Sequence, residues 1–310
     1  MCWSAPTSVS ENQSSVVVLG CFDGVHMGHR ALIARAKDIA RKRGLPLVAY
    51  SPESRKGQAL LTTPAEKTAL LHSLGCDSVI LADFAAIKDL SPLAFLQKVL
   101  WGQLHCAFAV CGYNFAFGKK AAGDGKLLCD FMRSIGGNAL VVPPVTFDEE
   151  PVSSTRIRAL LTDGHPADAA RLMGRPYTVT NVVCHGRAIG RTLGFPTLNL
   201  PFRDEKLIPK NGVYYCRVHT PMGLFGAVTN VGFRPTFADT PPDAVLEAHL
   251  LDFTGDLYDK EVSVEFLCFL RPECSFDSPQ ALAETVKGDI EKAIALKNQD
   301  PVLQKELEII

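Results

Sequence analysis

Residues Gly20–His29, which read GCFDGVHMGH, decide the fold of the first half of this chain. They follow a short apolar run, Val16–Leu19, and precede a basic amphipathic segment. This order predicts a strand, a tight glycine turn and the start of a helix. Backbone N–H groups at such a turn point outward, and the helix dipole favours negative charge. The segment is therefore suited to hold a phosphate group.

His26 and His29 carry the chemistry of this turn. Because they lie three residues apart at a helix start, they share one face, and each can donate a hydrogen bond to a phosphate oxygen. The alternative is a histidine pair that only caps the helix. The flanking glycines and the preceding strand favour the phosphate site.

Length and composition limit the class of protein. A chain of 310 residues predicts two domains, and a net charge of −1 argues against a broad surface for nucleic acid or membranes. We expect no signal peptide, no transmembrane helix, no protein partner and a disordered segment over residues 1–15. Ten cysteines without a Cys-x-x-Cys pair indicate free thiols rather than a zinc site, as in a cytoplasmic protein.

The first half alternates strand-like and helical segments. The predicted strands are Val16–Leu19, Leu45–Tyr50, Ser78–Leu81, Ala107–Cys111 and Ala139–Val142. Helices are marked by a capping box at Thr63–Glu66, by Ser91-Pro92, and by Gly44 and Gly75 at helix ends. The pattern predicts a Rossmann-like, doubly wound parallel sheet whose binding crevice lies at the carboxyl ends of the strands.

The second half alternates polar and apolar residues, which is typical of a small antiparallel barrel or sandwich. Its predicted strands are Tyr177–Cys184, Val213–Val218, Leu224–Asn230, Ala244–Asp252 and Glu261–Phe269. A terminal helix starts at Ser278-Pro279 and has an apolar stripe at Leu282, Val286, Ile290 and Ile294. Residues 153–175 are predicted to be helical. We therefore predict two domains, residues 16–174 and 175–310.

Three further segments can bind ligands. Gly112–Gly118, with Asp124 after it, could clamp a planar ring, or could be a core aromatic turn. Val152–Arg158 offers hydroxyls and arginines at a helix start, which suits phosphate or a plain N-cap with a solvated basic face. His185–Asn199 is glycine-rich and basic but does not have the spacing of a Walker A loop, and could simply turn a barrel corner.

Together these motifs identify a family. The chain resembles the bacterial bifunctional riboflavin kinase/FAD synthetases from about Val16 to Leu296. The resemblance rests on Gly20–His29, on VSSTRIR at Val152–Arg158, on GRTLGFPTLNL at Gly190–Leu200, and on the ordered motifs MGRPY, NVGFRPTF and LEAHLLDF. It implies an adenylyltransferase first half and a riboflavin kinase second half that acts on riboflavin and ATP.

The resemblance implies roles for residues of the kinase half. Glu247 would be the general base, because a primary alcohol is a poor nucleophile until its proton is accepted. The alternative for Glu247 is a carboxylate on the solvent face of a strand. Thr197 and Asn199 would hold Mg²⁺ and the ATP phosphates. ATP and flavin would be bound by Gly186, Gly190, Arg191, Gly194, Phe195, Pro196 and Asn199.

In the adenylyltransferase half, the FMN phosphate is already an anionic nucleophile, so the site needs donors rather than a base. His26 and His29 would be catalytic, and Asn114 and Asp124 would line the flavin and nucleotide side. The ATP phosphates would be bound by Gly20, Phe22, Asp23, Gly24, Ser154, Thr155 and Arg158.

The chain departs from the family pattern at Ala49–Arg55, where a histidine is replaced and Glu53 stands nearby. The departure predicts a weaker FAD-forming step. The main alternative is therefore a riboflavin kinase with a weakened adenylyltransferase-like domain. A flavin-binding regulator would not require Glu247, and a generic cytidylyltransferase would not explain the second half.

Overall fold

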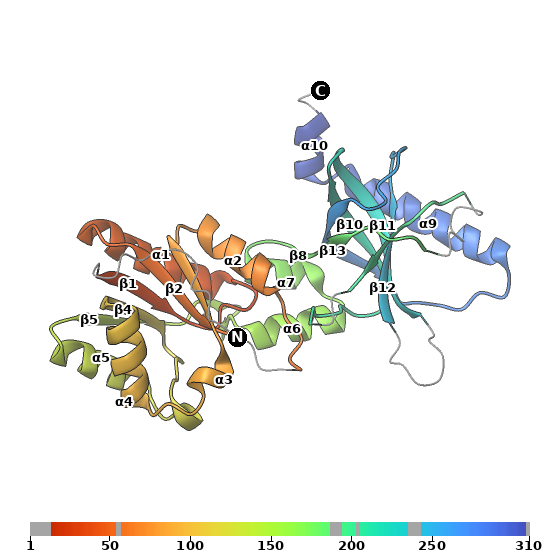
Figure 1. The fold of residues 1–310 in the computed structure, drawn as a ribbon. Coiled ribbons are helices and arrows are strands. Elements are labelled where there is room, and N and C mark those ends of the chain that lie inside the picture. The colour runs from red at the N-terminus through yellow and green to blue at the C-terminus, as the bar shows by residue number, and fades with distance from the viewer. Residues whose placement is uncertain (1–13, 54–56, 187–193, 203–204, 235–242, 308–310) are drawn as a thin grey trace. The chain divides into compact units, whose positions relative to one another are not determined.

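The computed structural model describes residues 14–53, 57–186, 194–202, 205–234 and 243–307. Its contacts divide the chain into two compact units, Met1–Ser154 and Thr155–Ile310 (Figure 1). Most of the segment predicted to be disordered lies outside the described residues, although Ser15 already belongs to the first strand.

The first unit is a five-stranded parallel sheet with the order β3-β2-β1-β4-β5. Its strands are β1 (Ser15–Leu19), β2 (Leu47–Pro52), β3 (Ser78–Ala82), β4 (Cys106–Gly112) and β5 (Asn138–Val142). β1 is central, and the strand order reverses on either side of it. The predicted doubly wound sheet is confirmed, and its crevice is expected at the carboxyl end of β1.

Helices cover both faces of this sheet (Figure 1). They are α1 (Met27–Arg43), α2 (Pro64–Ser73), α3 (Phe84–Ile87), α4 (Pro92–Phe95), the π-helix η1 (Leu96–Gln103), the 3₁₀-helix η2 (Lys119–Ala121) and α5 (Gly125–Ser134). Val16 and Val18 of β1 pack with α1 and α2, whereas Val17 and Leu19 pack with α4, η1 and α5. A hairpin of β6 (Thr146–Phe147) and β7 (Glu150–Pro151) ends the unit.

The predicted helix boundaries hold where side chains satisfy the terminal backbone groups. Thr63 and Glu66 form the capping box of α2, and Ser91 caps α4. Gly44 ends α1 in the left-handed conformation at φ 63°. The π-helix η1 was not predicted.

The second unit is a nearly closed six-stranded antiparallel barrel with the order β8-β13-β10-β11-β12-β9. Its strands are β8 (Tyr177–Val182), β9 (Leu198–Pro201), β10 (Gly212–Thr220), β11 (Gly223–Arg234), β12 (Asp243–Leu250) and β13 (Glu261–Arg271). The two end strands approach each other, because Cys184 N donates to Asn199 O at 2.9 Å. Strand β9 was missed by the sequence patterns.

Helices α6 (Ser154–Asp163), α7 (Pro166–Met173), α9 (Pro279–Lys297) and α10 (Pro301–Leu307) accompany the barrel. The single helical stretch predicted over residues 153–175 is two helices, because Gly164 is left-handed at φ 87° and Pro166 starts a new helix. The predicted stripe of α9 is correct for Ile290, which packs on the barrel, but Ile294 is 42% exposed. Ala293 is buried in its place.

Helix α7 belongs to the second unit, so a fragment of residues 154–310 is expected to be more stable to urea than one of residues 175–310. Leu172 and Met173 are at most 1% exposed, and burial of such side chains contributes about 1.5–3 kcal/mol each. Lys210 N also donates to Leu161 O of α6 at 3.0 Å. Equal urea midpoints for the two fragments would favour the predicted boundary at 174/175.

Candidate active sites

The turn between β1 and α1 has the strained backbone of a ligand-binding loop. Phe22 at φ 50° and Val25 at φ 41° adopt the left-handed region, which is unusual for a β-branched side chain. Gly24, at φ 81°, could not carry a Cβ, which would lie 2.8 Å from Leu61 Cδ1. The predicted strand, glycine turn and helix start are confirmed, with α1 beginning at Met27.

Asp23 fixes this turn through hydrogen bonds. Its buried carboxylate accepts hydrogen bonds from Leu61 N at 3.0 Å and Thr62 N at 3.1 Å, and Thr62 Oγ1 accepts one from Gly24 N at 3.0 Å. Ser154 Oγ donates to Asp23 O at 2.8 Å. Asp23 and Ser154 therefore fix the loop backbone, which is a supporting contribution to a phosphate site.

The two histidines share a face, as predicted. Their rings stack with centroids 3.7 Å apart, and Phe22 meets the His29 ring edge-on at 5.2 Å. His26 is also the N-cap of α1, since its Nδ1 accepts from His29 N at 3.4 Å. The capping role and the ligand role are compatible, because Nε2 of His26 is not used by the cap.

Both imidazoles are held neutral. Burial lowers the pKa of His26 to about 4. Burial, then the charges of His26 and Lys67, lower the pKa of His29 well below its usual 6.5. Nδ1 of His29 is buried and has no hydrogen-bond partner among the described residues. At neutral pH the pair supplies hydrogen-bond donors without a full positive charge.

The lowered pKa of His26 makes the first unit acid-sensitive. Between pH 6.5 and about 4 the unfolded chain binds a proton at His26 that the folded chain does not, so stability falls as the pH falls. From pH 7 to pH 5 this group alone costs about 2 kcal/mol. Urea unfolding should show that stability falls less between pH 7 and pH 5 in His26→Asn, which keeps a capping side chain. An unchanged loss would contradict the assignment.

The other predicted positions of this half lie in different settings. Asn114 is exposed in the turn after β4, and the exposed Asp124 is the N-cap of α5, accepting from Leu127 N at 2.8 Å. Phe117 is buried in the core, as in the core-turn alternative, whereas Tyr113 is exposed. Gly20 follows β1 directly, and a Cβ there would lie 3.1 Å from the Phe22 ring.

Thr155 and Arg158 follow Ser154 in helix α6 and fall in the second compact unit. Their predicted contact with phosphate stays a prediction. Of the segment that departs from the family pattern, Ser51 is fully buried and donates to Cys21 O at 2.9 Å. Residues 54–56 lie outside the described ranges.

Sequence reasoning missed Lys67 in this unit. The side chain is only 4% exposed, and its Nζ donates to Cys21 O at 2.9 Å and to Ser51 Oγ at 3.3 Å. The signal was available, because Lys67 lies four residues before the buried Leu71 on the inward face of α2.

The second unit has two neighbouring cavities of about 400 and 360 Å³, within the usual range for small-molecule sites. The first is lined by Gly186, Pro196–Asn199, Ala248, Leu250 and Phe253–Tyr258. The second is lined by Phe195, Thr197, Val213, Val228, Asn230, Glu247, His249, Arg271, Glu273, Cys274, Phe276, Leu282, Val286 and Asp289. Thr197 lines both cavities, and alternate residues of β12 face different ones.

Asn199 and Gly186 pack tightly in the first cavity. Asn199 is 4% exposed, and a Cβ on Gly186 would approach its amide group closer than 3.0 Å. Gly194, at φ 85°, needs a glycine conformation. Gly190 and Arg191 lie outside the described residues.

Glu247 lies between two asparagines in the barrel register. It is paired with Asn199 of β9 and with Asn230 of β11, so the three residues form a row across adjacent strands. Glu247 lines the second cavity and is partly buried. Asn230 and Arg271 line the same cavity and were not predicted as site residues.

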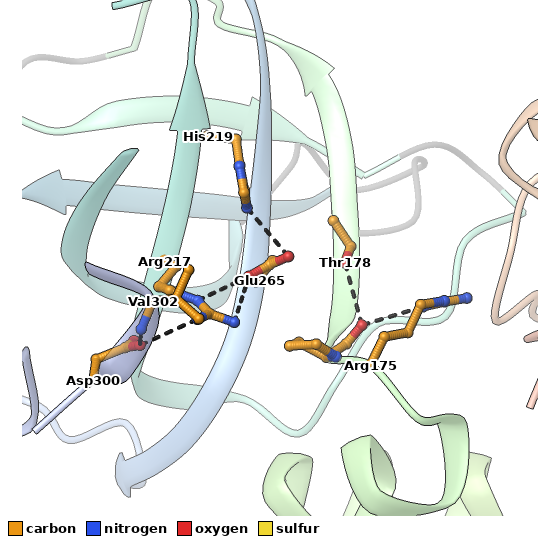
Figure 2. A network of polar contacts seen from close by, with 8 residues as sticks. Arg175, Thr178, Arg217, His219, Glu265, Asp300 and Val302 are labelled. Atoms are coloured by element: carbon orange, nitrogen blue, oxygen red, sulfur yellow. Dashed lines mark hydrogen bonds and ion pairs between the residues drawn. The ribbon is translucent and has the colours of Figure 1, made fainter. Parts of the chain in front are cut away.

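A separate polar network holds the end of the chain (Figure 2). Arg217 Nε and Nη2 contact Glu265 Oε2 at 2.9 Å, and Arg217 Nη1 contacts Asp300 Oδ1 at 3.1 Å. Asp300 also accepts from Val302 N at 3.0 Å, which starts α10. None of these residues lines either of the two cavities described above.

Comparisons with known proteins agree with the two-unit architecture. A family model described as FAD synthetase matches residues 8–156, and one described as riboflavin kinase matches residues 173–297. The bifunctional riboflavin kinase/FMN adenylyltransferase of Listeria monocytogenes is 33% identical over 288 residues, which are 89% of this chain and 90% of that protein. The protein of the same name from Pseudomonas fluorescens is 35% identical over 298 residues, covering 92% and 94%.

A crystal structure described as a macrolide-efflux protein from Streptococcus pneumoniae is also similar, with a TM-score of 0.82 and 32% identity. The match covers 90% of this chain and 93% of that one. In the described part of this chain, no helix combines the length and apolar character needed to span a bilayer.

Fold and sites define a two-unit transferase, with a nucleotidylyltransferase-like α/β unit followed by a barrel kinase unit. The chain belongs to the family of bifunctional riboflavin kinase/FMN adenylyltransferases. It converts riboflavin and ATP to FMN, and FMN and ATP to FAD and pyrophosphate. No comparison favours the kinase-only alternative.

Proposed function

We propose that riboflavin phosphorylation takes place where the two cavities of the second unit meet. The main support for this proposal is that Thr197 lines both cavities, whereas Glu247 lines only the second. ATP would occupy the first cavity and riboflavin the second. The terminal alcohol of riboflavin would then attack the γ-phosphorus beside Thr197, its proton would pass to a Glu247 carboxylate oxygen, and ADP would leave.

The donor set of the first cavity fits Mg²⁺. Thr197 and Asn199 offer a hydroxyl and an amide oxygen, and Mg²⁺ is commonly held by few protein oxygens together with substrate phosphates and water. Among the described residues no cluster of three His, Cys, Asp or Glu could hold a metal on its own. Bound Mg²⁺ would neutralise phosphate charge. Because Gly186 has no side chain, it leaves room for the Asn199 amide.

We propose that adenylyl transfer takes place at the carboxyl end of β1 in the first unit. An oxygen of the FMN phosphate would attack the α-phosphorus of ATP, and pyrophosphate would leave. His26 and His29 would donate hydrogen bonds to phosphate oxygens, while Asp23 and Ser154 hold the loop that presents its backbone N–H groups. Asn114 and Asp124 would line the flavin and nucleotide side.

We further propose that the enzyme works in the cytoplasm. The support is that the cysteines of the described part are free thiols, and that burial raises the pKa of Cys106, Cys111 and Cys216 to about 12. Such thiols persist unpaired in a reducing compartment.

Product chromatography tests the two activities together. Incubation with riboflavin, ATP and MgCl₂ is expected to yield FMN first and FAD later, and pyrophosphate should accompany the FAD. Chelation of Mg²⁺ should stop FMN formation. Accumulation of FMN without FAD at saturating ATP would favour the kinase-only alternative.

A further inference from the structure

Lys67 is a buried ammonium group at the binding edge of the parallel sheet. Its two acceptors, Cys21 O and Ser51 Oγ, lie at the carboxyl ends of the neighbouring strands β1 and β2. Ligands of doubly wound sheets bind at this edge. Lys67 is therefore fixed beneath the loop that carries His26 and His29.

The charge of Lys67 is incompletely matched by the protein. Among the described residues, no carboxylate oxygen lies close enough to Lys67 Nζ to form an ion pair, for which the limit is 4.0 Å. Lys67 is only 4% exposed, and its two hydrogen bonds use two of the three N–H donors of the ammonium group. A buried ammonium normally has an anionic partner, because desolvation without one is costly. The third N–H donor has no hydrogen-bond acceptor among the described residues.

The histidine pair makes such a cation useful. Burial keeps both imidazoles neutral, and the Lys67 charge itself contributes to the lowered pKa of His29, which places the ammonium near that ring. Burial also lowers the pKa of Lys67, but Asp23, then Cys21 and Glu53, oppose the shift. The loop thus combines neutral donors with one nearby cationic side chain.

We propose that Lys67 is a further catalytic residue of adenylyl transfer, whose Nζ binds a phosphate oxygen of the bound substrates at the ends of β1 and β2. The inference rests on the proposed location of adenylyl transfer in the first unit. In the reaction an FMN phosphate oxygen forms a bond to the α-phosphorus, and the bond from that phosphorus to the pyrophosphate oxygen breaks with its electron pair. No proton needs to move, and a fixed cation stabilises the transferred charge.

The test compares FAD formation by Lys67→Met, which removes the charge, with Lys67→Arg, which keeps it. The matched control is Lys37→Met, because Lys37 Nζ also donates to a backbone carbonyl, Leu74 O, in the same unit. Lys67→Met should lower kcat/KM for FAD formation by about 10²–10³, the effect of losing one preorganised donor. Lys67→Arg should retain at least tenfold more activity than Lys67→Met, and Lys37→Met should be unaffected.

Riboflavin phosphorylation and the thermal unfolding midpoint are measured on the same samples. A rise in KM for FMN identifies its phosphate as the ligand, a rise for ATP identifies the triphosphate, and a loss in kcat alone identifies the transition state. Each result supports the proposal when the midpoint is retained. FAD formation by Lys67→Met within threefold of wild type would overturn it, as would equal losses in both variants with a lowered midpoint.

If Lys67→Met does not fold, the pH profile of Lys67→Arg decides. The titratable groups that interact electrostatically with Lys67 are Asp23, Cys21, Glu53 and His29. The rate of FAD formation by wild type should fall at high pH, because the ammonium loses its proton. In Lys67→Arg this decline should occur at higher pH, because a guanidinium keeps its proton. A decline at the same pH in wild type and Lys67→Arg would overturn the proposal. If His29→Ala leaves FAD formation unchanged, the proposed location of adenylyl transfer fails instead.

Discussion

Glu247→Gln is expected to lose riboflavin phosphorylation by a factor of about 10²–10⁴ while still converting FMN to FAD. The amide has the shape of the carboxylate but cannot accept the proton of the attacking alcohol. Since Glu247 lines the second cavity in register with Asn199 and Asn230, the substitution leaves the barrel pairing intact. The loss should appear in kcat rather than in the affinity for riboflavin.

The measurement is the initial rate of FMN formation at saturating riboflavin and ATP, followed by FAD formation from added FMN. Glu261→Gln is the matched control, because Glu261 is an exposed strand residue of the same barrel that lines neither cavity. Phosphorylation by Glu247→Gln at more than a tenth of the wild-type rate would remove Glu247 from the role of base.

The sequence predicts the strands of both units because each is a run of apolar or alternating residues between turn signals. Strand β9 escapes this reasoning for a physical reason. It has only four residues, and it begins inside a segment whose glycines and charges suggest a binding loop. The helical stretch after Val152 is interrupted because Gly164 adopts a conformation that ends α6. Periodicity alone does not reveal that interruption.

The candidate sites are predicted only in part. His26 and His29 follow from the strand, turn and helix order, and their shared face is confirmed. The use of Asp23 to bind backbone amides of residues 61 and 62 depends on a contact across 38 residues, which no local pattern contains. Lys67 was missed because a lysine on a helix is normally solvated, although its spacing from Leu71 places it on the buried face of α2.

His29→Ala is expected to show the opposite selectivity, with FAD formation lower by about 10²–10³ and riboflavin phosphorylation unchanged. The substitution removes a neutral donor whose ring is held between His26 and Phe22, so the donor is positioned before substrate binds. His29→Asn keeps a donor and should retain more activity than the alanine variant. His72→Ala, on α2 of the same unit, is the control for loss of an imidazole.

Selectivity is the decisive part of this result. Because each compact unit has its own core, the lost imidazole should not alter the barrel cavities. The rates of FMN formation from riboflavin and of FAD formation from FMN are measured on the same preparation, with circular dichroism to check the fold. If both rates fall while the fold is retained, the two reactions share a site, and the assignment of His29 to adenylyl transfer alone is wrong. If only FAD formation falls, the neutral pair at the end of β1 contributes to that step through hydrogen bonding, and the positive charge must come from another residue.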